Sequence, residues 1–193
     1  FPSLSKILVM IDQDGDENYL PMLIPLEGGF PEHAFDGFFK GTRCHLGDCE
    51  IDSGVIYISA ESRTEQASTS YCCNLLTGEV TRLAASAWGA YPVAHSKDHR
   101  RVVLTDGYTL GDSVIYLWEE GKEDLTLLFG IPLEQRQPDQ QVPLNGIGSI
   151  AFVNQDRGLL LTTVMFEDTY SPAYLSLAKP GELSQVQVTG KAH

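Results

Sequence analysis

The stretch that decides the fold is Pro92-Val93-Ala94-His95-Ser96-Lys97-Asp98-His99-Arg100-Arg101-Val102-Val103-Leu104. Two apolar segments flank a short polar turn, a pattern typical of a β-hairpin. Ser96 and Asp98 stand two residues apart in that turn, where we expect their side chains to accept hydrogen bonds from nearby backbone N–H groups. The apolar run Val114–Trp118 and the turn residue Gly121 follow. The two strands of the hairpin, the strand Val114–Trp118 and one further strand after Gly121 together form a repeat of four strands.

The same order recurs along the chain. A second hairpin runs from Ile150-Ala151-Phe152-Val153 through the turn Asn154-Gln155-Asp156-Arg157 to Gly158-Leu159-Leu160-Leu161. An apolar strand, a polar loop, a second apolar strand and a glycine turn occur four times. The matching glycines are 50, 43 and 60 residues apart: Gly28, Gly78, Gly121 and Gly181. A loose period of this size, built from short strands, is typical of propeller blades.

Helix signals are nearly absent, so we predict an all-β, β-propeller-like fold of about four blades, each of four antiparallel strands, in a partial or open ring. One domain covers 1–193, with approximate blades at 1–40, 41–86, 87–131 and 144–193. The first repeat lacks its leading strand, because only Phe1–Lys6 precede Ile7. The glutamine-rich stretch Leu133–Pro143, which contains two prolines, predicts a linker over 132–143.

Composition and charge narrow the classes of partner. The 193 residues carry a formal net charge of −13, with 42% hydrophobic residues. That charge argues against nucleic acid and against an anionic membrane surface as partners. No apolar run approaches the ~20 residues of a membrane span, and the start of the chain lacks a signal-peptide pattern. Because the first residue is Phe1 and not methionine, we expect a processed or truncated chain.

The cysteine pattern favours reduced thiols. Four cysteines allow three disulfide connectivities, but the adjacent pair Cys72-Cys73 would point to opposite faces of a strand. We therefore expect thiols packed as small hydrophobic groups, which fits a cytoplasmic location.

One segment carries a resemblance to a known family. Ile7-Leu8-Val9-Met10-Ile11-Asp12-Gln13-Asp14-Gly15-Asp16-Glu17-Asn18-Tyr19 leads to Leu23-Ile24-Pro25-Leu26-Glu27-Gly28-Gly29. This resembles a blade of the N-terminal β-propeller of the prolyl oligopeptidase family, in its acylaminoacyl-peptidase and dipeptidyl-aminopeptidase-like branches. The Ser96–Val103 hairpin looks like a degenerate form of a signature shared by those propellers and TolB-like ones, S-P-D-G-K/R-x-I/L. Lys97 stands in the place of its proline and His99 in the place of its glycine.

The resemblance implies a non-catalytic role. In that family, the propeller covers an α/β-hydrolase domain that holds a Ser-Asp-His triad, and it restricts entry to short peptides. The expected partners are therefore a hydrolase domain of the parent chain and short peptide substrates passing through. An open ring would also leave unpaired edge strands, so self-association is expected.

Ser113 is the candidate for a serine nucleophile. A serine nucleophile elbow requires G-x-S-x-G on a strand-to-helix turn. Gly111-Asp112-Ser113-Val114-Ile115 has Ile115 in place of the second glycine and leads into a strand. We interpret Ser113 as a hairpin residue, and we expect no enzyme activity from this chain alone.

The sequence contains two incomplete sets of metal ligands. The acidic cluster Asp12, Asp14, Asp16 and Glu17 offers oxygen ligands, but an EF-hand requires glycine at the position of Glu17 and a bidentate glutamate at that of Leu23. We interpret the cluster as a solvated hairpin tip with Asp14-Gly15 as its turn. Cys44, His45 and Cys49, with Cys72 or Cys73, lack the second ligand pair of a zinc site.

The remaining candidates have structural interpretations. His33, His95 and His99 have no acidic neighbour at a recognisable spacing, and Trp88 and Trp118 are expected to pack. We therefore predict no catalytic, cofactor-binding or metal-binding residue and no cofactor. Two alternatives to the peptidase propeller stay open, namely a stand-alone propeller that binds proteins and a small all-β metal-dependent enzyme that uses Asp12–Glu17.

Overall fold

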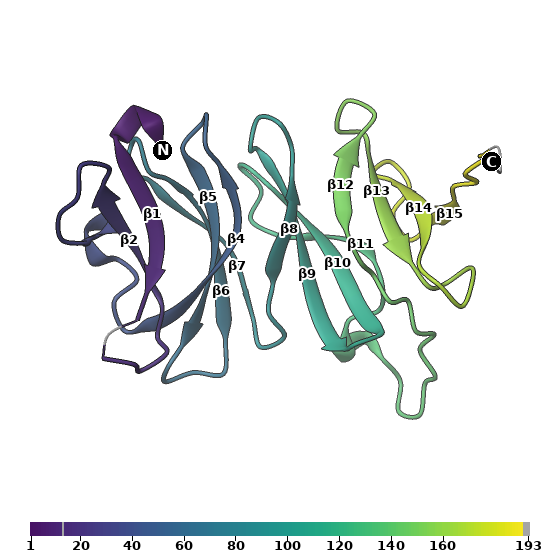
Figure 1. The fold of residues 1–193 in the computed structure, drawn as a ribbon. Helices are drawn as coiled ribbons and strands as arrows, with labels where there is room; N and C mark the ends of the chain where they lie inside the picture. The colour runs from purple at the N-terminus through teal and green to yellow at the C-terminus, as the bar shows by residue number, and fades with distance from the viewer. Residues whose placement is uncertain (13, 191–193) are drawn as a thin grey trace. The chain divides into compact units, whose positions relative to one another are not determined.

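The computed structural model describes residues 1–12 and 14–190; Gln13, within the resemblance motif, and residues 191–193, at the end of the predicted domain, lie outside them. The described chain forms four antiparallel sheets in succession (Figure 1). The first sheet consists of β1 (Lys6–Ile11), β2 (Leu20–Pro25) and β3 (Glu32–His33). The second consists of β4 (Thr42–Glu50), β5 (Val55–Ser62), β6 (Ser68–Asn74) and β7 (Val80–Ser86).

The third and fourth sheets follow the same plan. The third consists of β8 (Tyr91–His95), β9 (Arg101–Thr109), β10 (Asp112–Glu119) and β11 (Thr126–Phe129). The fourth consists of β12 (Ile150–Val153), β13 (Gly158–Thr163), β14 (Ser171–Ser176) and β15 (Leu183–Gln185). Each strand pairs with its neighbour in sequence, so each sheet is a simple meander. The helical segments are the three short 3₁₀ turns η1 (Pro2–Leu4), η2 (Ala34–Gly37) and η3 (Leu133–Gln135).

These strands confirm the predicted all-β class and its succession of antiparallel sheets. The first sheet has three strands, whereas the other three have four. The first sheet thus has no strand that corresponds to β4, β8 and β12, in agreement with the prediction that the first repeat lacks its leading strand.

The chain divides into two compact units, which we describe separately. The first spans Phe1–Pro92, and the second begins at Val93. In the first unit, β5 is buried along its whole apolar run, Val55–Ala60. Burial of consecutive residues requires cover on both faces of a strand. The uninterrupted run of β5 is therefore covered on both faces, as expected of a strand in the middle of a sheet.

The second unit has its own apolar core, which draws on both of its sheets. Its fully or nearly fully buried members are Val103, Ile115, Leu117, Leu128, Leu159, Leu161, Ala173 and Leu175. These residues come from β9, β10, β11, β13 and β14, so the third and fourth sheets pack against each other through this core.

The repeated glycines share one backbone conformation. Gly28, Gly78, Gly121 and Gly181 have φ angles from 76° to 91°. This left-handed region is strained for residues with a Cβ. The sequence repeat therefore records the same type of turn at the same place in each sheet.

The hairpin turn between β8 and β9 forms as expected. Ser96 Oγ accepts a hydrogen bond from the N–H of Arg101 at 3.0 Å, and Asp98 Oδ1 accepts one from the N–H of Arg100 at 3.1 Å. His99, which takes the place of the signature glycine, has φ 58°. The histidine therefore adopts the left-handed conformation that glycine would adopt at this position.

The hairpin turn between β12 and β13 differs. Asn154 Oδ1 accepts from the side-chain Nη2 of Arg157 at 3.2 Å, and the backbone bond from Arg157 N to Asn154 O closes the turn. Asn154, Gln155 and Asp156 all have φ between 57° and 59°. The two turns share the closing backbone bond, which runs from His99 N to Ser96 O at 2.9 Å in the first turn and from Arg157 N to Asn154 O in the second. They differ in their side-chain bonds, because Asn154 Oδ1 accepts from a guanidinium and not from the backbone.

Candidate functional site

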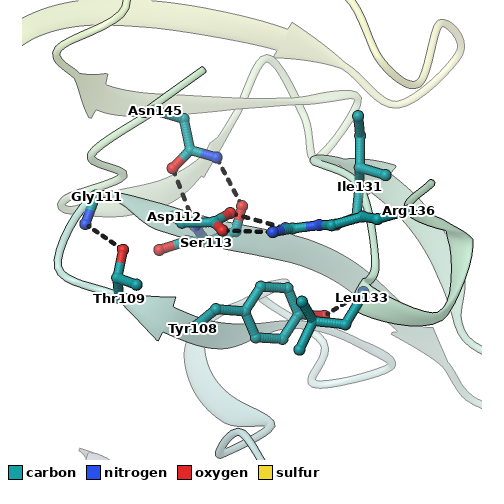
Figure 2. Close-up of polar contacts among 9 residues, drawn as sticks. All are labelled: Tyr108, Thr109, Gly111, Asp112, Ser113, Ile131, Leu133, Arg136 and Asn145. Atoms are coloured by element: carbon teal, nitrogen blue, oxygen red, sulfur yellow. Dashed lines mark hydrogen bonds and ion pairs between the residues drawn. The ribbon is translucent and has the colours of Figure 1, made fainter. Parts of the chain in front are cut away.

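Ser113 lies at the start of β10 and is held by a neighbouring segment of the chain. Its N–H donates to Asn145 Oδ1 at 3.1 Å, and its carbonyl accepts from Asn145 Nδ2 at 2.7 Å (Figure 2). An asparagine side chain that binds both polar groups of one residue mimics a neighbouring β-strand. Ser113 is therefore a strand residue next to a hairpin, in agreement with its interpretation from sequence.

The acidic residues of the first unit bind backbone and side-chain donors. Asp16 Oδ1 accepts from the N–H of Asn18 at 2.9 Å, and Asp16 Oδ2 lies 3.9 Å from Arg63 Nη1. Asp14 and Gly15 have φ angles of 57° and 76°, as a tight hairpin turn requires. The interpretation of Asp14-Gly15 as the turn is thus confirmed.

The cysteines are free thiols on β4 and β6. Cys44 and Cys73 belong to the core of the first unit, whereas Cys49 and Cys72 are half-buried. Burial raises the pKa of Cys44 to about 11 despite its hydrogen bond with Thr42, and burial also raises that of Cys73. A raised pKa keeps a thiol protonated and unreactive. These cysteines are packing residues.

The other candidates do not come together as a site. His45 Nε2 lies 3.2 Å from Glu61 Oε1, and the rings of His95 and His99 stack with centroids 4.7 Å apart. His33 is exposed on β3, and Trp88 is 45% exposed. Within residues 1–12 and 14–190, no group of three His, Cys, Asp or Glu side chains is placed to hold a metal ion.

The most elaborate polar site lies in the second unit, around Arg136. Arg136 Nη1 donates to Asp112 Oδ2 at 2.7 Å, and Nη2 donates to Asp112 Oδ1 at 2.9 Å (Figure 2). The same guanidinium binds the carbonyl of Ile131 through Nε at 2.9 Å and through Nη2 at 2.7 Å. Its carbon lies 4.8 Å from the centroid of the Tyr108 ring. We call Asp112, Arg136, Tyr108 and Ile131 the arginine clamp.

The clamp is largely shielded from water. The side chains of Arg136 and Asp112 are 14% and 11% exposed. The hydrogen bonds to Asp112 raise the pKa of Arg136 above its ordinary value. Burial raises the pKa of Tyr108, whose hydroxyl accepts from the N–H of Leu133 at 3.3 Å. A bidentate pair in this setting is geometrically specific as well as strong.

A second set of contacts fixes the end of the segment after η3. Asn145 N donates to Gly111 O at 2.7 Å, and the carbonyl of Asn145 accepts from Val164 N at 3.2 Å and from the hydroxyl of Thr163. Asn145 is 3% exposed. The arginine clamp and Asn145 therefore attach both ends of the predicted linker to the sheets of the second unit.

Beside the clamp lies a small apolar pocket. It has a volume of about 250 Å³ and is lined by Phe129, Gly130, Ile131, Val142, Pro143, Asn145, Met165 and Gly181. Both ends of the Asn145 amide are bound to Ser113, and both oxygens of Asp112 are bound to Arg136. These groups are positioned for structure and not for proton transfer. The arrangement can hold an apolar side chain but offers no nucleophile and base in contact.

The role of Arg136 was not predicted from the sequence. The linker interpretation of 132–143 rested on glutamines and prolines, and Arg136 is its one basic residue. A lone arginine in a polar stretch was the available signal. Its partner Asp112 lies 24 residues earlier, so no local pattern joins the two.

This chain is similar to known proteins in its fold and not in its sequence. No family model and no curated protein matches the sequence. Among solved structures, TolB from Acinetobacter baumannii aligns with a TM-score of 0.57 and 12% identity over 96% of this chain and 41% of its own. An oligogalacturonate lyase in complex with manganese gives 0.59 and 14% identity, over 90% of this chain and 45% of its own.

A prolyl endopeptidase gives a TM-score of 0.55 and 11% identity, over 94% of this chain and 27% of its own. These neighbours are β-propeller proteins, and the chain spans less than half the length of each. The predicted β-propeller-like fold is therefore confirmed. In the described part of the chain, no helix is long and apolar enough to cross a membrane.

Proposed function

We propose that this chain is the non-catalytic propeller portion of a serine peptidase that resembles the prolyl oligopeptidase family. In the parent protein it would gate the access of peptides and dock an α/β-hydrolase domain. The observation that carries the proposal is the run of antiparallel meander sheets that aligns with a prolyl endopeptidase over 94% of this chain.

The turns support the same proposal. The resemblance motif Asp12–Tyr19 contains the left-handed Asp14-Gly15 turn, and the Ser96–Asp98 turn forms the hydrogen bonds that its signature requires. Both carboxylate oxygens of Asp112 are bound by Arg136, and the backbone of Ser113 is bound by Asn145, so these contacts of the polar centre are structural and are compatible with a scaffold role.

A stand-alone propeller that binds proteins is the second candidate. The fold alone leaves this candidate open, since TolB aligns with a TM-score of 0.57 and the prolyl endopeptidase with 0.55. The metal-dependent enzyme on Asp12–Glu17 finds no support, since Asp16 binds Asn18 and Arg63.

Sequencing of the complete reading frame distinguishes the first two candidates. A downstream G-x-S-x-G within an alternating strand and helix pattern supports the peptidase, whereas further blades followed by a stop codon contradict it. The parent protein should then be labelled by a fluorophosphonate probe on that serine, and the 193-residue chain should not be labelled. Labelling of this chain would overturn the non-catalytic assignment.

The location and the assembly of the chain belong to the same proposal. Four unpaired thiols, two of them buried, fit a cytoplasmic protein. β15 ends the fourth sheet, and an edge strand carries backbone groups that can pair with another copy. Sedimentation of the isolated chain should therefore show self-association that grows with concentration, and a monomer at millimolar concentration would contradict it.

A further inference from the structure

A second hollow lies in the second unit, where the β8–β9, β12–β13 and β14–β15 turns converge. Its volume is about 530 Å³. The residues that matter for its chemistry are Arg101, Asp156, Arg157, Tyr174, Ser176 and Leu177. It shares no lining residue with the apolar pocket beside the arginine clamp.

The guanidinium of Arg101 is held in place by contacts with Asp156 and Phe152. Its Nη1 donates to the backbone carbonyl of Asp156 at 2.7 Å, and its carbon lies 5.7 Å from the centroid of the Phe152 ring. The carboxylate Oδ2 of Asp156 lies 3.6 Å from Nη2, which is longer than a hydrogen bond. Asp156 is thus an ion-pair partner of Arg101 whose carboxylate forms no hydrogen bond with it, and the hydrogen bond from Nη1 uses one of the five N–H donors of this guanidinium.

Arg157 supplies a second guanidinium, and its protein partners are neutral. Nε donates to the carbonyl of Asn154 at 3.1 Å, and Nη2 donates to Asn154 Oδ1 at 3.2 Å. Among the described residues, no carboxylate forms an ion pair with it. The bond from Leu177 N to Arg157 O, at 3.1 Å, joins its backbone to the other wall of the hollow. The positive charge of Arg157 is therefore held in place without compensation.

The remaining walls match a ligand with one negative charge. Two guanidinium groups and the single carboxylate of Asp156 give the lining a net charge of +1, in a chain of net charge −13. Tyr174 and Ser176 add hydroxyl groups, and Leu177 and Ala178 add apolar surface. A carboxylate carries one charge and fits the planar fork of arginine. A phosphate dianion would leave one charge uncompensated.

We propose that this hollow binds the carboxylate group of a peptide, supplied by a C-terminus or by an acidic side chain. The guanidinium groups of Arg101 and Arg157 bind the carboxylate oxygens, and Leu177 and Ala178 contact the apolar part of the ligand. The site requires no hydrolase domain, so it stands independently of the peptidase assignment.

The test is a titration of the ¹⁵N-labelled chain followed by NMR. N-acetyl-leucine offers an α-carboxylate, the α-amide of N-acetyl-glutamic acid offers a side-chain carboxylate, and N-acetyl-leucinamide is the uncharged match. Saturable shifts of the Arg157 and Leu177 amides are expected with either carboxylate, and the tighter of the two identifies the source. Equal shifts with the leucinamide, no saturation with any carboxylate, or tighter binding of inorganic phosphate would overturn the proposal.

Variants of Arg157 test whether its guanidinium binds the carboxylate. Arg157→Gln should weaken carboxylate binding about tenfold, since hydrogen bonds to a charged group are lost. Arg157→Lys, which keeps the charge without the fork, should also weaken it. Lys179→Gln is the matched control, because this exposed lysine lies near the hollow in sequence but does not line it. If Lys179→Gln weakened binding as much as Arg157→Gln, the effect would be general electrostatics and the site would be refuted.

Discussion

Asp112 and Arg136 form a two-point contact between the first residue of β10 and the residue after η3. The two bonds, 2.7 and 2.9 Å long, join residues 24 positions apart in the chain. Because Arg136 also binds the Ile131 carbonyl, the contact pulls the segment after β11 back onto the sheet that it has just left. The predicted linker is thus part of the folded unit over its first half.

Replacement of Arg136 tests this contact. Arg136→Lys keeps the positive charge but loses the bidentate geometry and the stacking on Tyr108. We expect a loss of about 1.5–3 kcal/mol in the free energy of unfolding, the range for lost hydrogen bonds to a charged group. Urea denaturation followed by circular dichroism measures it.

The control is Arg100→Lys. The pair between Arg100 and Glu120 has side chains that are 68% and 55% exposed, so water screens it. We expect little change in stability. Equal losses for the two variants would refute the view that the shielded setting of Arg136 makes its contact stronger.

The sequence was sufficient for the hairpins and insufficient for the clamp. Ser96 and Asp98 bind backbone groups within five residues of themselves, so the local pattern contains both partners. Asp112 and Arg136 meet because sheet formation folds the chain back, and no spacing rule encodes that. The ring of Tyr108, which covers Arg136, could not be predicted for the same reason.

The turn at Asp98 should make stability depend on pH. The hydroxyl of Ser96, at 2.6 Å, and the N–H of Arg100 hold the pKa of the Asp98 carboxyl below its usual range. A lowered carboxyl pKa stabilises the folded state above the unfolded pKa of about 3.9, and that stability is lost as the pH falls through the folded value. Asp98→Asn should therefore reduce the loss of stability between pH 5 and pH 2, by no more than about 1 kcal/mol.

Urea unfolding at several pH values measures how steeply the free energy of unfolding changes with pH. Asp139→Asn, in the exposed stretch after η3, is the control for removal of one carboxylate. An unchanged slope in Asp98→Asn, or the same change in both variants, would contradict the role assigned to the turn.

Gly158 should resist replacement because of space. A Cβ at this position would collide with the hydroxyl and ring of Tyr174. We expect Gly158→Ala to cost about 1–2 kcal/mol, as overpacking does, and to displace Tyr174 from the wall of the larger hollow. Gly107→Ala is a matched control on β9, since a Cβ there meets nothing within 4 Å. Thermal unfolding of both variants decides the question, and equal melting temperatures would disprove the steric reason.

The buried thiols should make the fold sensitive to alkali. Burial raises the pKa of Cys44 to about 11. The protonated thiol therefore stabilises the folded state fully below the unfolded thiol pKa of about 8.5, and this stabilisation is lost as the pH rises through 11. Cys44→Ala removes this titration, and its packing loss does not depend on pH. The variant should therefore lose less stability than the natural sequence between pH 7.5 and pH 10.5, measured by urea unfolding under reducing conditions. Cys49→Ala, at a half-buried position on the same strand, should alter that slope less, and a larger effect from Cys49 would show that burial is not the cause.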